Sequence, residues 1–477
     1  MLAPFGAMLA LGSLTMLPPI GIELIYRDGA IAPFADSFWL MLLAGLALWL
    51  PFRRIGMELQ NRQGIVVVVA LWVSVCIMSA LPFLFADRPE MSFIDSLFES
   101  TSGLTTTGAT VLPVLDGLPH SILYYRAQLN FIGGIGIVVL AIAVLPMIGI
   151  GGMQLYRAET PGPFKDEKLT PRIKETAKRL SIVYLVLVAL CAWAFWVAGM
   201  NVFDAVAHSF ATLALGGFST HTNSLDYFHS PAIELVAALF SLVAGMNFGL
   251  IYLSWYRKSP LPLLKDPEFR FYLGVMTLLT VIVCLGLYAS GTFPLRAALY
   301  HGIFQTASVV TDNGLAAGGY PNWPAPIALL LIMGSFFGGC VGSTCGGIKA
   351  MRFLLLIKQS LHEIRLLIHP RGRFFVKIGQ RPIPERAMQA VWGFYFLYVL
   401  VFCVFSLALT ATGVDIVSAF GSVAGCLNNM GIGYGMTGVH FGVLSDPAKW
   451  LLTLAMLLGR LELFPMLMLL TPAYWRS

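Results

Sequence analysis

Apolar stretches of about 20 residues, long enough to cross the ~30 Å hydrocarbon core of a bilayer, recur along the whole 477-residue sequence. Hydrophobic residues make up 57% of the chain and charged residues 11%, whereas soluble proteins carry about 25% charged residues. This excludes an ordinary soluble enzyme and predicts an all-α polytopic membrane protein with about ten transmembrane helices. The candidate spans are 3–26, 36–52, 63–86, 120–150, 178–200, 231–256, 271–291, 324–358, 388–412 and 447–470.

Basic residues predict the orientation of these spans. Of the 30 lysines and arginines, 23 fall in four segments that follow alternate spans, namely 53–62, 157–179, 257–270 and 349–386. Cytoplasmic loops carry an excess of basic residues, so we expect these segments and both termini in the cytoplasm. The net charge of +6 is spread too thinly to form a basic domain, and we expect no nucleic-acid partner.

A short motif recurs between the spans, roughly every hundred residues. In the first two copies an aspartate is followed thirteen residues later by a glycine, and the third copy keeps this offset without the aspartate. This pattern indicates internal duplication, as in many transport proteins. Chance similarity is the alternative, and it is hardest to exclude for the fourth copy. The copies lie at 95–108, 204–217, 301–314 and 415–431.

Each copy of the motif is too short or too polar to cross the bilayer and ends in a loop rich in glycine or polar residues. Non-helical backbone at membrane depth persists only where protein buries it or water reaches it. Four such loops around one axis can supply a ring of carbonyl oxygens that replaces the hydration shell of a monovalent cation. Glycine permits the dihedral angles that aim these carbonyls inward.

The sequence resembles the Trk-type potassium uptake subunits of the Trk/Ktr/HKT superfamily, essentially from end to end. The resemblance implies a homodimer in the bacterial inner membrane and a cytosolic nucleotide-binding regulatory subunit of the RCK type. It also implies one pore per protomer, built from four M1–pore helix–M2 repeats after two extra N-terminal helices. The runs that carry the resemblance are 102–110, 151–159, 208–221 and 427–429. The implied units are 1–60 (extra helices), 61–156, 157–258, 259–370 and 371–477 (repeats 1 to 4).

The resemblance also implies which residues bind the cation through their backbone. In this superfamily, glycine at the position of Gly108 accompanies potassium, and serine accompanies sodium. The third loop departs from the family pattern, because Asp312 places a carboxylate where a neutral side chain is usual. We expect this carboxylate near the mouth, where it would concentrate cations. The implied residues are Thr106, Thr107 and Gly108; Leu215, Gly216 and Gly217; Asp312, Asn313 and Gly314; and Asn429, Met430 and Gly431.

Five glycines lie within residues 338–347 of the eighth expected span. Each interior glycine destabilises a helix by about 1 kcal/mol relative to alanine, so we expect an intramembrane loop there. A glycine-rich face for close helix packing is the alternative. The family has a gating loop at this place, usually in contact with an arginine of the last helix. The implied gate residues are Gly338, Gly339, Gly342, Gly346, Gly347 and Arg460.

Four ionisable residues of the first two copies have simpler interpretations. Asp95 and Asp204 stand where short helices are expected to begin, so we interpret them as N-caps rather than ion ligands. Glu99 and His208 share a repeat position, and we expect both to form structural hydrogen bonds. A proton relay is the alternative for His208.

These observations predict potassium uptake through a carbonyl-lined filter, with potassium bound there. The alternative is a proton- or sodium-coupled transporter of another solute, with intramembrane acids as relays. An enzyme is not expected, because the sequence contains neither HExxH nor GxSxG. Residues 433–438 match GxGxxG, but no expected strand precedes them, so we expect no organic cofactor.

Overall fold

The computed structural model describes residues 2–52, 61–143, 169–372, 374–379 and 381–475. In these ranges the chain is helical apart from connecting loops and one antiparallel pair of strands, β1 (Lys377–Ile378) and β2 (Arg381–Pro382). Six of the described helices are long and apolar enough to cross a membrane, or eight if two bent pairs each count as one span. The predicted all-α polytopic membrane fold is confirmed.

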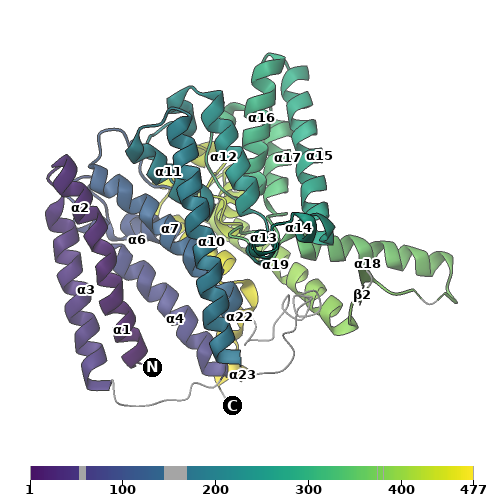
Figure 1. Ribbon diagram of the computed structural model, residues 1–477, viewed down its shortest axis with the longest axis horizontal. Coiled ribbons are helices and arrows are strands. Elements are labelled where there is room, and N and C mark those ends of the chain that lie inside the picture. Colours follow the sequence, from purple (N-terminus) through teal and green to yellow (C-terminus); the bar gives the residue numbers. More distant parts are fainter. Residues whose placement is uncertain (1, 53–60, 144–168, 373, 380, 476–477) are drawn as a thin grey trace.

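The N-terminal helices lie together at one side of the molecule (Figure 1). α1 and α3 approach so closely that a side chain at Gly6 or Gly45 would collide with the backbone of the other helix. Small residues permit such contacts between membrane helices. The elements are α1 (Leu2–Ser13), η1 (Leu14–Met16), α2 (Leu17–Tyr26) and α3 (Ile31–Phe52).

The first two repeats each contain a long helix, a short helix and a returning helix. In repeat 2 the returning helix is α12, which is bent by 92° from α13. Repeat 1 contains α4 (Asn61–Ser79), α5 (Leu81–Leu84), α6 (Phe93–Leu104) and α7 (His120–Ala143). Repeat 2 contains α10 (Leu169–Val197), α11 (Val202–Ala214), η2 (Ser224–Phe228), α12 (Pro231–Ala244) and α13 (Phe248–Tyr256). The run 151–159 lies outside the described residues.

The last two repeats follow the same plan. In repeat 4 the returning helix α21 is bent by 117° from α22. Repeat 3 contains α14 (Leu261–Lys265), α15 (Pro267–Ala289), α16 (Leu295–Val310), η3 (Tyr320–Asn322), α17 (Ala325–Ser335) and α18 (Ala350–Ile368). Repeat 4 contains α19 (Glu385–Ala411), α20 (Ile416–Leu427), η4 (Gly435–Thr437), η5 (Phe441–Val443), α21 (Asp446–Arg460), α22 (Leu463–Leu470) and α23 (Pro472–Trp475).

The predicted eighth span, 324–358, is interrupted, as its five glycines led us to expect. α17 ends at Ser335 after 11 residues, and helix resumes only at Ala350. The helix that follows, α18, extends sideways from the bundle (Figure 1). The glycines that follow Ser335 account for the interruption, because they favour irregular backbone over helix.

The short helices α6, α11 and α20 begin at equivalent positions, fifteen residues before the loop glycine. Their N-caps are Ser92, Asn201 and Asp415, and each side chain accepts the N–H three residues later. Asp95 and Asp204 were therefore wrongly predicted as N-caps, since they accept hydrogen bonds from the capping side chains instead. This shared start also places the fourth copy in register with the first two.

Candidate functional site

The four loops after the short helices have the same backbone conformation. The second residue of each implied set donates its N–H to a carbonyl five residues earlier. The first residue of each set has a positive φ, although none of the four is glycine, and such a conformation is uncommon for other residues. The bonds are Thr107 to Ser102 (2.8 Å), Gly216 to Ala211 (2.8 Å), Asn313 to Ser308 (2.7 Å) and Met430 to Gly425 (2.8 Å). The φ values are 49° at Thr106, 53° at Leu215, 62° at Asp312 and 58° at Asn429.

The four loop glycines close these loops into a ring. Each has a positive φ, and a Cβ at each would lie 2.5 Å or less from a carbonyl oxygen of the next loop. Each loop therefore touches its neighbour in cyclic order, with a carbonyl beside every glycine. The pairs are Gly108 with Gly216, Gly217 with Asn313, Gly314 with Met430, and Gly431 with Thr107. The structure thus brings all twelve implied cation-site residues into one assembly.

The side chain of Asp312 does not lie at the outer mouth. It is fully buried, and its Oδ2 would lie 3.5 Å from a Cβ at Gly338 and 3.3 Å from a Cβ at Gly347. The carboxylate therefore faces the glycine-rich loop behind the ring, and the prediction that it concentrates cations at the mouth is wrong. The left-handed backbone at Asp312 accounts for this, because it turns the side chain away from the direction expected for an extended loop.

A polar side chain on each short helix braces the segment that leaves the ring. Glu99 accepts the Val111 N–H at 3.0 Å, and His208 Nε2 lies 2.9 Å from Ser219 Oγ. Gln305 accepts the Ala317 N–H at 3.1 Å, and Ser422 shares a hydrogen bond with Thr437. All four side chains stand nine positions before the loop glycine. The predicted structural hydrogen bonds of Glu99 and His208 are confirmed.

The glycine-rich segment forms a buried, non-helical loop between α17 and α18, as predicted, and the alternative of a continuous helix with a packing face is wrong. Gly347 donates its N–H to Asn428 O at 3.1 Å, beside the fourth ring loop. Thr344 donates to Leu213 O at 3.1 Å, at the end of α11. Gly338, Gly342 and Gly347 have positive φ values of 64°, 79° and 65°. We call residues 336–349 the crossing loop.

Arg460, at the end of α21, contacts the crossing loop. Its Nη1 donates to Thr344 O at 2.9 Å, and the side chain is 6% exposed. Its Nε and Nη2 have no hydrogen-bond partner among the described groups. Glu462, to which the sequence assigns no role, pairs with Arg352 at the start of α18 (3.0 Å).

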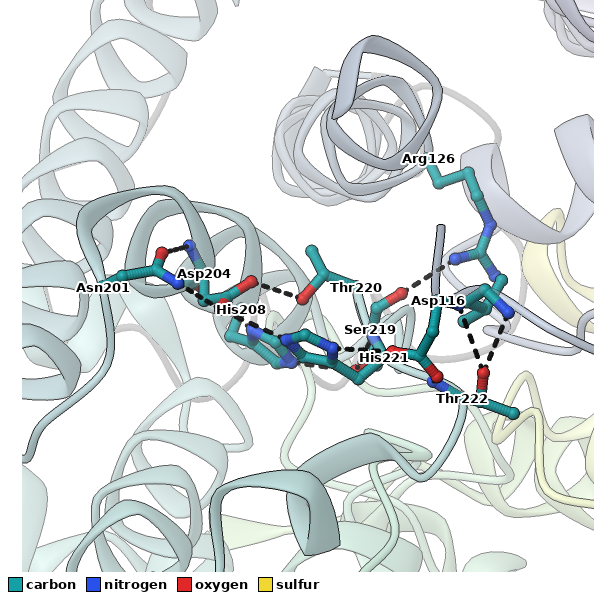
Figure 2. A network of polar contacts seen from close by, with 10 residues as sticks. Asp116, Arg126, Asn201, Asp204, His208, Ser219, Thr220, His221 and Thr222 are labelled. Atoms are coloured by element: carbon teal, nitrogen blue, oxygen red, sulfur yellow. Dashed lines mark hydrogen bonds and ion pairs between the residues drawn. The ribbon is translucent and has the colours of Figure 1, made fainter. Parts of the chain in front are cut away.

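A second polar network lies outside the ring and joins the loops of repeats 1 and 2 (Figure 2). His221 bridges two carboxylates, with Nδ1 3.0 Å from Asp116 Oδ1 and Nε2 3.2 Å from Asp204 Oδ2. It also stacks on Tyr227, with ring centroids 3.4 Å apart. Burial alone would lower the pKa of His221, but the hydrogen bonds to Asp204 and Asp116 outweigh it, and the pKa is raised.

This raised pKa predicts how thermal stability changes with pH. The stabilisation from protonated His221 is fully present below its ordinary pKa of about 6.5, and it is lost as pH rises through the raised pKa of the folded state. We expect His221→Gln to flatten the fall in melting temperature between about pH 6 and 9, measured on purified protein in detergent. His229→Gln, at an exposed position of the same segment, should keep the wild-type slope. An unchanged slope in His221→Gln would contradict the assignment.

These features define a multi-pass membrane protein in which four loops of the same backbone conformation contact one another in a ring. The sequence matches the TrkH family, described as a cation transport protein, over residues 30–477. The chain belongs to this family, which confirms the resemblance and is a family of transporters rather than enzymes.

Relatives and a solved structure agree with the family. The chain is 49% identical to a Trk system potassium uptake protein TrkH of Vibrio parahaemolyticus, over 99% of this chain and 98% of that protein. It is 45% identical to the Trk system potassium uptake protein TrkG of Escherichia coli, over 99% and 97%. The crystal structure of the potassium transporter TrkH from Vibrio parahaemolyticus superposes with a TM-score of 0.93 and 46% identity, covering 100% of this chain and 99% of that one.

Proposed function

We propose that this chain takes up potassium across the bacterial inner membrane and that the ion binds to backbone carbonyls of the four-loop ring. The observation that carries the proposal is the cyclic contact of four positive-φ glycines with the carbonyls of neighbouring loops. Carbonyl dipoles suit a weakly hydrated monovalent cation, because they can replace its water shell without fixed charge. The relatives, described as Trk system potassium uptake proteins, support potassium as the ion.

The acids on the first two short helices give little support to the alternative of a coupled transporter for another solute. Glu99 is engaged by Arg126 at 2.7 Å and by the Val111 N–H. Asp95 pairs with Lys449 at 2.6 Å, and Asp204 accepts from Thr220 at 2.6 Å. Groups held in this way position loops, whereas a relay needs acids that exchange partners with the transported species.

We propose that the crossing loop is the gate and that Arg460 holds it in the closed position. The loop is hydrogen-bonded at the ends of the short helices α11 and α20, so a displacement of the loop would remove protein that lies directly against the ring. The gate residues would be Gly338, Gly339, Gly342, Gly346 and Gly347, together with Arg460. Glycines suit a hinged segment because they adopt conformations closed to other residues.

The proposed assembly is a homodimer that works with a cytosolic RCK-type nucleotide-binding subunit, with both termini in the cytoplasm. α18 leaves the bundle and exposes apolar side chains, among them Leu361, Ile364 and Leu367, which a second protomer would cover. The proposed units are 1–60, 61–156, 157–258, 259–370 and 371–477. Mass measurement in nanodiscs tests the dimer, and a monomeric mass would contradict it.

Rubidium uptake into proteoliposomes tests the proposed function. We expect uptake of labelled rubidium that excess potassium suppresses more strongly than excess sodium, without an imposed proton or sodium gradient. Uptake that requires such a gradient would favour the coupled transporter. If rubidium does not enter even after activation by the regulatory subunit, the proposal fails.

The buried position of Asp312 leads to a prediction about ionic strength. We expect Asp312→Asn to change potassium flux by the same factor at about 0.01 M and about 1 M salt, because screening acts on exposed charges. Asp116→Asn is the matched control, since the Asp116 side chain is 49% exposed, and its effect should shrink as salt rises. A strong salt dependence for Asp312→Asn would place its carboxylate near the mouth after all.

A further inference from the structure

Arg126, on α7, is a buried cation that sequence analysis did not single out. Its side chain is 1% exposed and its partner Glu99 is fully buried. An ionisable side chain at membrane depth is unfavourable unless it is paired, and it commonly has a function. The three nitrogens of its guanidinium have different partners, which tie together two ring loops.

The contacts of Arg126 define a clamp, of which Figure 2 shows the hydrogen bond to Ser219. Nε donates to Glu99 Oε1 at 2.7 Å. Nη1 donates to the backbone oxygen of Ser219 at 2.8 Å, and Nη2 donates to Thr110 Oγ1 at 3.2 Å. The guanidinium also lies over the Phe218 ring, 4.2 Å from its centroid, which adds a cation–π contact.

The two clamped residues occupy equivalent positions in adjacent loops. Thr110 stands two residues after Gly108, and Ser219 stands two residues after Gly217. These loops already touch where Gly108 meets Gly216 O. A single side chain therefore fixes the separation of two neighbouring loops just beyond the proposed cation site. Arginine suits this task because its planar fork holds several acceptors at fixed angles.

The pair with Glu99 keeps the clamp electrically neutral. An unpaired guanidinium beside the ring would repel cations, because Coulomb interactions are strong in a medium of low dielectric constant. Glu99 balances that charge and also accepts the Thr110 hydroxyl and the Val111 N–H. The same carboxylate thus holds the first loop from the pore-helix side while Arg126 holds it from α7.

We infer that Arg126 is a positioning residue that determines selectivity for potassium over sodium by fixing the spacing of loops 1 and 2. The inference rests on the proposed function, since it takes the ring as the cation site. Lysine at this position keeps the charge near Glu99, but a single ammonium cannot reach all three acceptors in the same geometry. Loop spacing should then relax although the buried charge stays paired.

The test is the ratio of potassium to sodium permeability, measured from reversal potentials of purified protein in planar bilayers. We expect Arg126→Lys to fold and to pass potassium, with a permeability ratio lowered on the order of tenfold, because charge-assisted hydrogen bonds that hold the loops are lost. Arg352→Lys is the control, since Arg352 is also buried, paired with a carboxylate and placed over a ring, that of Phe394. It should leave the ratio unchanged.

A double variant keeps the inference testable if Arg126→Lys does not fold. Arg126→Gln with Glu99→Gln removes both charges together and leaves no unpaired buried ion, so we expect folded protein with lowered selectivity. A wild-type ratio in either folded variant overturns the inference and leaves the proposed function intact. An absence of rubidium flux in the wild-type protein would instead overturn the proposed function itself.

Discussion

Replacement of Arg460 by alanine is expected to raise ion flux in the absence of any regulatory subunit. Arg460 donates to Thr344 O in the crossing loop at 2.9 Å. A hydrogen bond from a charged donor contributes about 1.5–3 kcal/mol. Its loss shifts a closed-to-open equilibrium by roughly tenfold or more, if the bond exists only in the closed state.

The measurement is rubidium flux into proteoliposomes, normalised to folded protein. Lys449→Ala is the control, because Lys449 lies on the same helix and is also buried and ion-paired, with Asp95, but has no hydrogen bond to the crossing loop among the described contacts. It should lower stability without raising flux. Arg460→Ala with flux equal to or below wild type would show that the arginine does not hold the loop closed.

Deletion of Gly346 and Gly347 is a second test of whether the crossing loop closes the pore. Gly347 bonds to Asn428 O, and a Cβ at Gly346 would collide with that oxygen, so both glycines lie against the fourth ring loop. A shorter loop cannot span the same distance, and flux should rise as in Arg460→Ala. Lysine and arginine often anchor a helix by extending their side chains to the membrane edge. In that case Arg460 would be well exposed, whereas it is only 6% exposed.

The sequence was most informative where the bilayer or a backbone conformation restricts the choice of residue. Transmembrane helices can be predicted from the sequence because each needs about 20 consecutive apolar residues to cross the bilayer. The loop glycines were readable because positive φ and a neighbouring carbonyl leave room for no other residue, as at Gly314 and Gly431. The interruption of the eighth span could be predicted from its five glycines, because each glycine destabilises a helix.

Ion pairs between residues far apart in the sequence could not be predicted in this way. The partners of Arg126 and Lys449 lie 27 and 354 residues away, and nothing local identifies them beyond a basic residue in an apolar helix. The direction of the Asp312 side chain depends on the left-handed backbone conformation of Asp312 itself, which the neighbouring sequence does not predict. Similarly, the leading aspartates resembled N-caps because the true caps, Ser92 and Asn201, stand only three residues earlier.

Gly108→Ser is expected to lower the ratio of potassium to sodium permeability by about tenfold or more. A Cβ at Gly108 would lie 2.5 Å or less from Gly216 O, so the serine must push a ring carbonyl of the next loop out of place. A non-glycine residue at positive φ adds roughly 1–2 kcal/mol of strain. Since 1.4 kcal/mol of relative binding corresponds to a tenfold ratio, a small shift of this carbonyl suffices.

Two further variants separate the ring contact from backbone strain. Gly108→Ala lacks the hydroxyl but keeps the Cβ, and it should lower the ratio as well if displacement of the carbonyl is the cause. Gly117→Ala is the matched control, because Gly117 has a φ of 89° and no atom within 4 Å of its Cβ position. It carries the same strain outside the ring, so it should lower melting temperature and leave the reversal potential in mixed potassium and sodium unchanged. A wild-type reversal potential for folded Gly108→Ser would remove this glycine from the cation site, and with it the argument that contact between adjacent loops sets selectivity.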